Sequence, residues 1–279
     1  MIPSAFDYFR PQTLDEALAL LARRQDAKIL AGGHSLIPAM KLRLAQPETI
    51  IDLGRLSGLS YIREQDGRIA IGAMTTHGEI EFSALLRDQC PLLTEVAAQI
   101  GDAQVRNKGT LGGSLVHADP AADWPAAILA LDAELEIAGS NGRRTVKSAE
   151  FFVDMMQTSL LPGEILCEIR VPPTPRSVAY VKFAQKASGF AIAGVAAVVN
   201  KARKTLSVGI TGVAAKPYRA SAVENALRGA SLTPPAIDRA ADRAAEGVDP
   251  LNDIHASAEF RAHLARVNTR RALHLASNR

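Results

Sequence analysis

The chain has 279 residues, of which 47% are hydrophobic and 22% are charged, so it can bury a substantial core and is unlike a disordered polypeptide. Lysine and arginine exceed aspartate and glutamate by 32 − 29 = 3, an excess too small to indicate nucleic-acid binding. The start lacks the pattern of a signal peptide, and no apolar run is long enough to span a membrane. We therefore expect a soluble, cytoplasmic protein.

The two cysteines, Cys90 and Cys167, limit the metal centres that the chain can hold. Two thiols supply neither a four-thiolate zinc site nor an iron–sulfur cluster that needs four thiolates. A disulfide is disfavoured because nothing in the sequence indicates export. Both cysteines lie beside apolar residues, so we predict two buried thiols.

Residues 1–60 are expected to alternate helix and strand. Thr13 and Glu16 have the spacing of a capping box, and the apolar residues after them recur at helical intervals. A short strand that runs into a glycine turn is predicted at 28–33, and a second strand at 49–53. Loops at the strand ends of such βα units commonly bind ligands.

The segment 61–174 is expected to mix strands and helices. The patterns predict strands at 69–74 and 164–172 and a helix at 91–101. A Ser-Asn-Gly turn between 134–139 and 143–147 is a hairpin signal.

A proline-rich stretch at 172–176 is the best candidate boundary in the chain, because clustered prolines fit neither a helix nor a central strand. Three successive strands, expected to be antiparallel, follow it and precede helical patterns at 219–230, 234–247 and 256–276. Strands followed by helices indicate an α+β module. We expect three parts, spanning 1–60, 61–174 and 175–279.

The last helix carries several arginines, including Arg261, Arg266, Arg270 and Arg271. They could bind RNA or an acidic partner surface. Phe260, Leu264 and Val267 give the helix one apolar stripe, so a solvated basic face is the favoured interpretation.

The first glycine-rich segment runs from Ala31 to Ser35 and has the sequence AGGHS. Two adjacent glycines after a strand let the backbone turn sharply and approach a ligand closely. Successive N–H groups in such a turn can form an anion-binding concavity, and Ser35 adds a hydroxyl donor. A purely structural turn explains this segment equally well.

The second segment, Gly109 to Ser114, has the sequence GTLGGS and is interpreted as a loop of the same kind. Two such loops suggest a diphosphate held between them. Neither matches the dinucleotide-binding GxGxxG pattern, and the chain has no P-loop motif. Standard nucleotide-binding folds are therefore disfavoured, although phosphate binding is still supported.

An acidic turn, residues 117–125, follows the second segment. Asp119 and Asp123 could accept hydrogen bonds from sugar or ribityl hydroxyls. The alternatives are a turn residue at Asp119 and a helix N-cap at Asp123. His117 and Asp119 alone are poor evidence for a metal site, because no third ligand lies nearby.

Taken together, these motifs resemble the FAD-binding medium subunits of molybdenum hydroxylases, a group that includes aerobic carbon monoxide dehydrogenase and the xanthine dehydrogenases. The resemblance spans nearly the whole chain. Besides the two glycine-rich segments, it rests on Phe6, Tyr8, Pro11, Thr13 to Leu18, Arg106-Asn107, Asp119 to Asp123 and the PGEIL run at 162–166.

The resemblance implies an α+β fold of the PCMH type: two α/β subdomains that hold FAD, then a C-terminal domain with a three-stranded antiparallel sheet and helices. It places Ile100 against the cofactor, Asp123 at the ribityl chain, and Leu166 and Lys182 near the flavin. Residues at the adenosine diphosphate part and the pyrophosphate would be Leu30, Ala31, Gly32, Gly33, His34, Ser35, Leu36, Gly109, Thr110, Leu111, Gly112, Gly113 and Ser114. Asp119 is also expected to contact the cofactor, at a sugar or ribityl hydroxyl.

His34 and Phe190 can each be interpreted in two ways. A histidine after two glycines is covalently joined to the flavin in some members of the wider superfamily, but the resemblance implies that His34 leaves FAD non-covalently bound. Many relatives have an acidic residue, and often a tyrosine, where this chain has Ala187-Ser188-Gly189-Phe190. Phe190 could stack on the isoalloxazine ring or be an ordinary core residue at a strand start.

The resemblance implies an electron-transfer subunit without catalytic or metal-ligating residues of its own. A molybdopterin-binding large subunit and a small subunit with 2Fe–2S clusters are the expected partners, in a dimer of heterotrimers. The alternatives are a self-sufficient flavin oxidoreductase and a non-enzymatic scaffold that has lost FAD.

Overall fold

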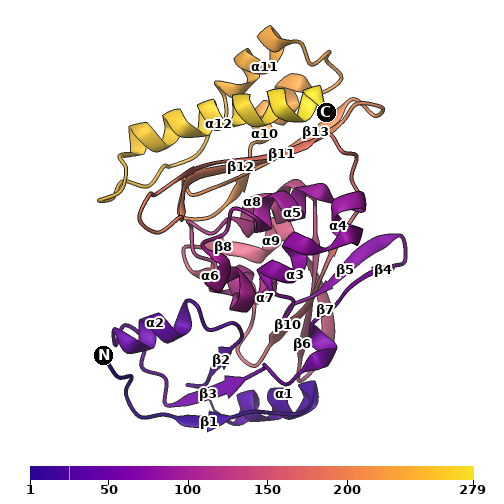
Figure 1. Cartoon of the computed structure of the whole chain (residues 1–279). Coiled ribbons are helices and arrows are strands. Elements are labelled where there is room, and N and C mark those ends of the chain that lie inside the picture. The colour runs from indigo at the N-terminus through magenta and orange to yellow at the C-terminus, as the bar shows by residue number, and fades with distance from the viewer. Residues whose placement is uncertain (25) are drawn as a thin grey trace.

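The protein consists of three parts that follow one another in chain order, as the computed structural model shows for residues 1–24 and 26–279. Figure 1 shows the N-terminal part in indigo at the bottom, a larger middle part, and the C-terminal part in orange and yellow at the top. Each part has its own β-sheet.

The N-terminal part is a parallel three-stranded sheet in the order β1-β3-β2, with two helices. Thr13 begins the first helix as predicted, because its hydroxyl accepts the N–H of Glu16 at 3.1 Å. The Glu16 carboxylate accepts the N–H of Gln12 rather than that of Thr13, so the capping box is only half formed. The elements are β1 (Asp7–Phe9), α1 (Leu14–Arg23), β2 (Lys28–Leu30), α2 (Leu36–Lys41) and β3 (Thr49–Asp52).

The middle part contains an antiparallel five-stranded sheet in the order β4-β5-β10-β6-β7. The predicted Ser-Asn-Gly hairpin is confirmed, since Gly139 pairs with Gly142 across the turn. The strands are β4 (Ile62–Gln65), β5 (Arg68–Gly72), β6 (Glu134–Gly139), β7 (Gly142–Lys147) and β10 (Ile165–Val171).

Six short helices lie between β5 and β6. The predicted helix at 91–101 is confirmed but ends at Ala97. The main core forms where these helices pack on the sheet, around fully buried side chains such as Trp124 and Phe151. The helices are α3 (His77–Phe82), α4 (Ala84–Gln89), α5 (Pro91–Ala97), α6 (Ala103–Lys108), α7 (Leu111–His117) and α8 (Trp124–Ala130).

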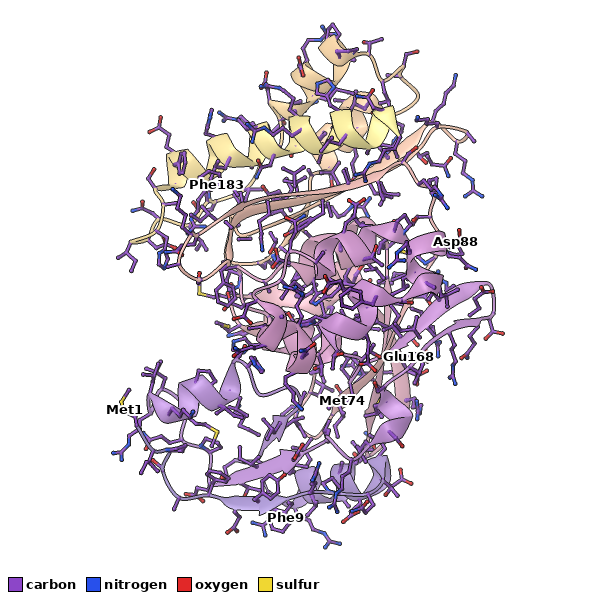
Figure 2. All side chains as sticks on the ribbon, in the orientation of Figure 1. Met1, Phe9, Met74, Asp88, Glu168 and Phe183 are labelled. Carbon is purple, nitrogen blue, oxygen red and sulfur yellow. The ribbon has the colours of Figure 1, made fainter. Side chains whose placement is uncertain are left out.

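Smaller elements complete the first two parts. The turn η1 (Ser57–Leu59) precedes β4, and α9 (Ser148–Phe151) leads into a small hairpin of β8 (Phe152–Asp154) and β9 (Gln157–Thr158). A shared core joins the parts, because β10 and β6 residues pack with β3 and α1 residues. Met74 packs against this core, and Figure 2 shows it where the lower and middle parts meet.

The C-terminal part is an antiparallel sheet covered on one face by helices. The three predicted strands are present, and a two-residue fourth strand extends the expected three-stranded sheet. In Figure 1, α12 lies above the sheet, while α5 and α8 of the middle part pack beneath it. The elements are β11 (Val178–Ala184), β12 (Ala191–Asn200), β13 (Thr205–Thr211), β14 (Tyr218–Arg219), α10 (Ser221–Leu227), α11 (Pro234–Ala241) and α12 (Ala258–Asn278).

The interpretation of α12 as a uniformly solvated basic face is wrong at one position. Arg261 is 4% exposed and donates to the carbonyl oxygen of Ile192 at 3.0 Å and to Asp253 at 2.7 Å. Arg266 and Arg271 are exposed, as expected. Arg261 therefore joins α12 to β12 and to the loop that contains Asp253.

The two cysteines are buried free thiols, as predicted. Burial raises the pKa of Cys90 to about 12 and that of Cys167 to about 11. Of the helices in the described ranges, none is long and apolar enough to cross a membrane.

Candidate functional site

The two glycine-rich segments come together at the junction of the N-terminal and middle parts. A Cβ placed on Gly32 would lie 2.1 Å from the carbonyl oxygen of Lys108 and 2.7 Å from Cα of Gly109. Real Cβ contacts are essentially never shorter than 3.0 Å, so only glycine fits at position 32. We call this contact the glycine junction.

The first segment offers unused backbone donors. Gly33 has a φ of +76°, which favours glycine, and it turns the chain between β2 and α2. Across the described ranges, no protein acceptor is found for the N–H groups of residues 32–35. His34 and Ser35 are exposed. A row of free N–H groups at such a turn is suited to an anion.

The second segment differs from the loop that the sequence predicts. Gly109 ends α6, and Gly112 and Gly113 lie in the first turn of α7, where the hydroxyl of Thr110 caps the helix. Its N–H groups are largely consumed by protein acceptors: Gly109 donates to Val105 at 2.7 Å, Leu111 to Thr75 at 2.9 Å, Gly112 to Ala73 at 2.8 Å, and Gly113 to the Thr110 hydroxyl at 3.1 Å. The segment thus supplies close packing more than backbone donors.

Gly112 shows this packing role directly. A Cβ there would lie 2.6 Å from the Cβ of Ala73 and 2.7 Å from its carbonyl oxygen. The helix α7 can therefore approach the end of β5 only with glycine at this position. Ser114, on the next turn, is half-buried.

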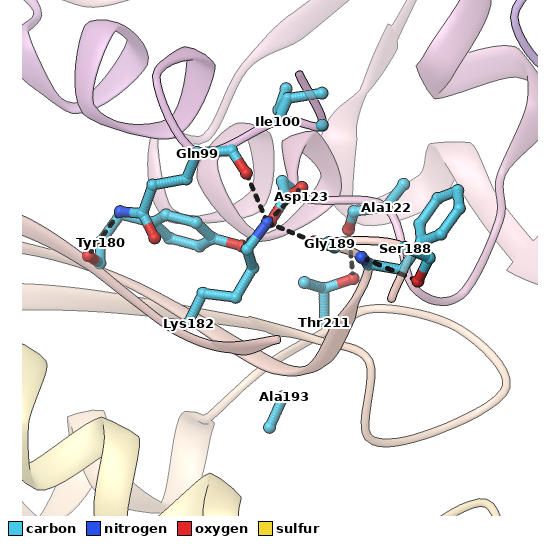
Figure 3. A network of polar contacts seen from close by, with 12 residues as sticks. Gln99, Ile100, Ala122, Asp123, Tyr180, Lys182, Ser188, Gly189, Ala193 and Thr211 are labelled. Atoms are coloured by element: carbon cyan, nitrogen blue, oxygen red, sulfur yellow. Dashed lines mark hydrogen bonds and ion pairs between the residues drawn. The ribbon is translucent and has the colours of Figure 1, made fainter. Parts of the chain in front are cut away.

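Asp123 lies in a buried polar network between the middle and C-terminal parts (Figure 3). It accepts the Tyr180 hydroxyl at 2.5 Å, and Nζ of Lys182 lies 3.0 Å from its Oδ1. The carboxylate forms no cap bond with α8, so the helix-cap alternative is not supported. Burial raises the pKa of Asp123, whereas the charge of Lys182 and the hydrogen bonds from Tyr180 and Lys182 act to lower it.

Lys182 also joins two backbone segments. Its Nζ donates to the carbonyl oxygen of Gln99 at 2.6 Å and to that of Gly189 at 2.8 Å. These contacts tie the turn that contains Ile100 to the loop that ends at Phe190, as Figure 3 shows for the lysine and the two carbonyls. Phe190 is 48% exposed, so the ordinary-core alternative is wrong for this residue.

Asp119 has the role that its turn alternative predicted. Its side chain accepts the N–H of Ala121 at 2.8 Å. The turn docks on β13, since the Thr211 hydroxyl donates to the carbonyl oxygens of Pro120 at 3.0 Å and Ala122 at 2.7 Å. The acidic turn is therefore held by the C-terminal sheet.

The remaining predicted residues are apolar. Leu166 is 4% exposed and belongs to the core of the five-stranded sheet. Ile100 is half-buried against the same core. Leu30 and Leu36 flank the first glycine segment and are half-buried.

Sequence reasoning missed His77, Trp124 and Tyr180. The Trp124 indole N–H donates to Nδ1 of His77 at 3.1 Å, and the His77 backbone N–H donates to the carbonyl oxygen of Gly109 at 2.9 Å. Burial, with smaller effects of His34 and Arg106, lowers the pKa of His77 to about 4. The one available signal was the capping box Thr76–Glu79, which marks His77 as the first residue of a helix.

A polar hollow of about 450 Å³ lies against the five-stranded sheet and is lined by Tyr61, Glu136, Glu168 and Arg170, among others. Arginines outnumber glutamates three to two in its lining, and both glutamates are ion-paired: Arg170 pairs with Glu136 at 2.6 Å and also with Glu168, which accepts the Tyr61 hydroxyl. The glycine junction does not line this hollow. No group of three potential metal-ligating side chains gathers in the described part of the chain.

Comparison with known proteins gives the class of the chain. Residues 4–174 match the family described as FAD binding domain in molybdopterin dehydrogenase, and residues 178–276 match the CO dehydrogenase flavoprotein C-terminal domain. The chain therefore belongs to the FAD-binding medium subunits of the molybdenum hydroxylase family.

Individual relatives cover essentially the whole chain. The carbon monoxide dehydrogenase medium chain of Hydrogenophaga pseudoflava is 40% identical, over 99% of this chain and 98% of the relative. The nicotine 6-hydroxylase medium subunit of Paenarthrobacter nicotinovorans is 36% identical over 96% of each chain. A structure of the Hydrogenophaga carbon monoxide dehydrogenase that lacks the molybdenum-pyranopterin moiety matches with a TM-score of 0.96 and 42% identity, over 100% of this chain and 99% of that chain.

Proposed function

We propose that this chain is the FAD-binding electron-transfer subunit of a heteromeric molybdenum hydroxylase. The observation that carries the proposal is the glycine junction, where the free N–H groups of residues 32–35 meet the start of α7. The family match gives the ligand of such a site as FAD.

The residues present fit FAD. The free N–H row of residues 32–35 would hold the diphosphate, and the half-buried Ser114 would add a hydroxyl from the other side. Ile100 and the exposed ring of Phe190 would contact the flavin, held in place through Lys182. Bound FAD would supply reversible uptake and release of electrons, while the protein positions the ring and tunes its potential.

The contacts of Asp123, Lys182 and Leu166 change the roles proposed for them. Asp123 and Lys182 satisfy each other inside the protein, with side chains that are each 5% exposed. Leu166 is part of the sheet core. We propose that Lys182, paired with Asp123, supports the cofactor site by fixing the turn at Ile100 and the loop at Phe190, and that Leu166 supports it as part of the sheet core.

The partners follow from the relatives, which are named as medium chains or medium subunits. A large subunit would carry the molybdenum cofactor and a small subunit the 2Fe–2S clusters, in a dimer of heterotrimers. The two buried thiols of this chain are too few for a four-thiolate cluster, which supports that division of labour. Reduced, unpaired cysteines support a cytoplasmic location.

We also propose that the chain is organised as subdomains 1–60 and 61–174, which clasp FAD, and a C-terminal domain at 175–279. The separate sheets support these divisions. The shared core of the first two subdomains indicates that they form one structural unit, because β10 residues Ile165 and Cys167 pack with Ala17 and Ile51.

The purified chain should bind about one FAD and should not oxidise a hydroxylase substrate alone, because the proposed substrate site lies on another subunit. Visible absorbance after gel filtration measures the bound flavin. Acid precipitation should leave the flavin in the supernatant, since no covalent bond to His34 is expected. Reduction of the flavin by a small-molecule substrate without partners would instead favour the self-sufficient oxidoreductase.

FAD should also raise the melting temperature. A ligand that binds only the folded state stabilises it by about 2.7 kcal/mol when its free concentration is 100 times the Kd. Differential scanning fluorimetry with FAD, and with riboflavin as a control that lacks the diphosphate, tests this. A melting temperature independent of FAD would argue for a scaffold without a cofactor.

A further inference from the structure

His77 is a buried polar residue at the glycine junction, and it is absent from the site that the sequence predicts. It is 4% exposed and begins α3. Its Nδ1 accepts the indole N–H of Trp124 at 3.1 Å, and the centroids of the two rings are 5.8 Å apart. Since an indole N–H can only donate, Nδ1 must carry a lone pair and no proton.

The proton of the neutral ring must then reside on Nε2. Nε2 lies against Gly109: a Cβ placed on that glycine would be 2.7 Å from Nε2. A Cβ placed on Gly32 would in turn lie 2.7 Å from the Cα of Gly109. The Nε2–H donor of His77 therefore lies where the two glycine-rich segments meet.

Within residues 1–24 and 26–279, no protein acceptor is found for Nε2, and the His77 side chain forms its hydrogen bond with Trp124. Nε2 is not among the side-chain atoms that are fully buried without a hydrogen-bond partner, so the small exposed part of His77 lets solvent or a ligand reach this nitrogen. The neighbouring free N–H groups of residues 32–35 point to an anionic ligand at the same place.

We propose that His77 is a positioning residue that donates Nε2–H to a diphosphate oxygen of bound FAD, and that Trp124 fixes the tautomer required for this bond. The inference rests on the proposed function and adds a neutral donor to the junction. A neutral imidazole donates a hydrogen bond without adding a charge. His77 would therefore orient the diphosphate without changing the net charge of the glycine junction.

The test compares FAD and ADP affinities of the wild type with those of His77→Leu and His77→Gln. Leucine removes the donor, and we expect both Kd values to rise about 10- to 100-fold, the range for a lost hydrogen bond to a charged group. Glutamine keeps an N–H donor at a similar reach and should recover most of the affinity. Kd values are taken from titrations of protein shown to be folded by circular dichroism.

His77→Leu also leaves the Trp124 N–H unpaired, so the double variant His77→Leu/Trp124→Phe separates folding from binding. It no longer buries an unpaired indole N–H, and on protein shown to be folded it should remain as weak as His77→Leu in FAD and ADP binding. Trp124→Phe alone should cost less affinity than His77→Leu, because the imidazole can still present the correct tautomer part of the time.

A direct readout comes from the wild type labelled with ¹⁵N-histidine. The Nε2–H resonance of His77 should move downfield on addition of FAD and equally on addition of ADP, which carries the diphosphate without the flavin. An unmoved resonance, or a His77→Leu variant that binds FAD like the wild type, would overturn the His77 proposal alone. A wild type that binds no FAD would overturn the proposed function as well.

Discussion

Replacing Gly32 with alanine should weaken FAD binding by about 100-fold, or about 2.7 kcal/mol, which is within the range for a lost hydrogen bond to a charged group. The added Cβ would lie 2.1 Å from the carbonyl oxygen of Lys108, a distance that the backbone must relieve by moving. Movement would separate the donor row of the first segment from the start of α7. Fluorescence titration with FAD measures the effect.

Gly58→Ala is the matched control. Gly58 lies in the turn η1, and an added Cβ there would have no atom within 4 Å. This variant should bind FAD like the wild type and melt at a similar temperature. If Gly32→Ala is folded and also binds FAD like the wild type, the two segments cannot be in contact in the cofactor-bound protein.

Replacing Lys182 with methionine should lower the free energy of unfolding by about 3–5 kcal/mol, the usual cost of removing one partner from a buried ion pair. Both side chains of the pair are 5% exposed, so solvent screens them little. The variant also loses the bonds to the Gln99 and Gly189 carbonyls. Urea unfolding of the purified chain gives the value.

The sign of the pH dependence provides a second check on this variant. Burial raises the pKa of Asp123, and the positive charge of Lys182 opposes that rise. The Lys182→Met variant lacks this opposing charge. When the pKa of a carboxyl group is higher in the folded state than in the unfolded state, the free energy of unfolding falls as the pH rises from the unfolded-state pKa to the folded-state pKa. The deficit of Lys182→Met should therefore be larger at pH 8 than at pH 5.

The double variant Lys182→Met/Asp123→Asn should recover part of the lost stability, because it no longer buries an unpaired carboxylate. The difference in unfolding free energy between this double variant and the wild type should also be independent of pH. An equal deficit for Lys182→Met at both pH values would mean that Asp123 is not the buried partner of Lys182. Lys186→Met, at an exposed position in the adjacent loop, is the control and should leave the unfolding free energy unchanged within about 0.5 kcal/mol.

Local signals predicted much of the fold. The strand before Gly32 and Gly33 and the hairpin around Ser140 and Asn141 follow from residue types within a few positions of each other. The hairpin of β4 and β5 was missed, although its Asp66-Gly67 pair is a local hairpin signal; both residues have positive φ in the two-residue turn.

Packing between distant segments was not predictable from those signals. The sequence GTLGGS resembles a loop in isolation, yet the contact of Gly112 with Ala73 makes it the buried start of a helix. Asp123 precedes α8 as an N-cap would, but Tyr180 and Lys182, more than fifty positions away in sequence, capture its carboxylate. Such partners are known only once the chain is folded.

The same limit applies to His77 and Trp124, which are 47 positions apart and form one hydrogen bond. Each looks like an ordinary residue at the start of a helix. Their significance depends on Gly109, which lies between them in sequence and against His77 in space. The periodicity of α12 likewise gave no sign that Arg261 would be buried.

A crystal structure of this chain with bound FAD would show whether the two glycine-rich segments hold the diphosphate between them. We expect diphosphate oxygens about 3 Å from N–H groups of residues 32–35, a hydrogen-bonding distance, and within the same reach of the segment Gly109 to Ser114. FAD bound with its diphosphate away from one of the two segments would contradict this expectation.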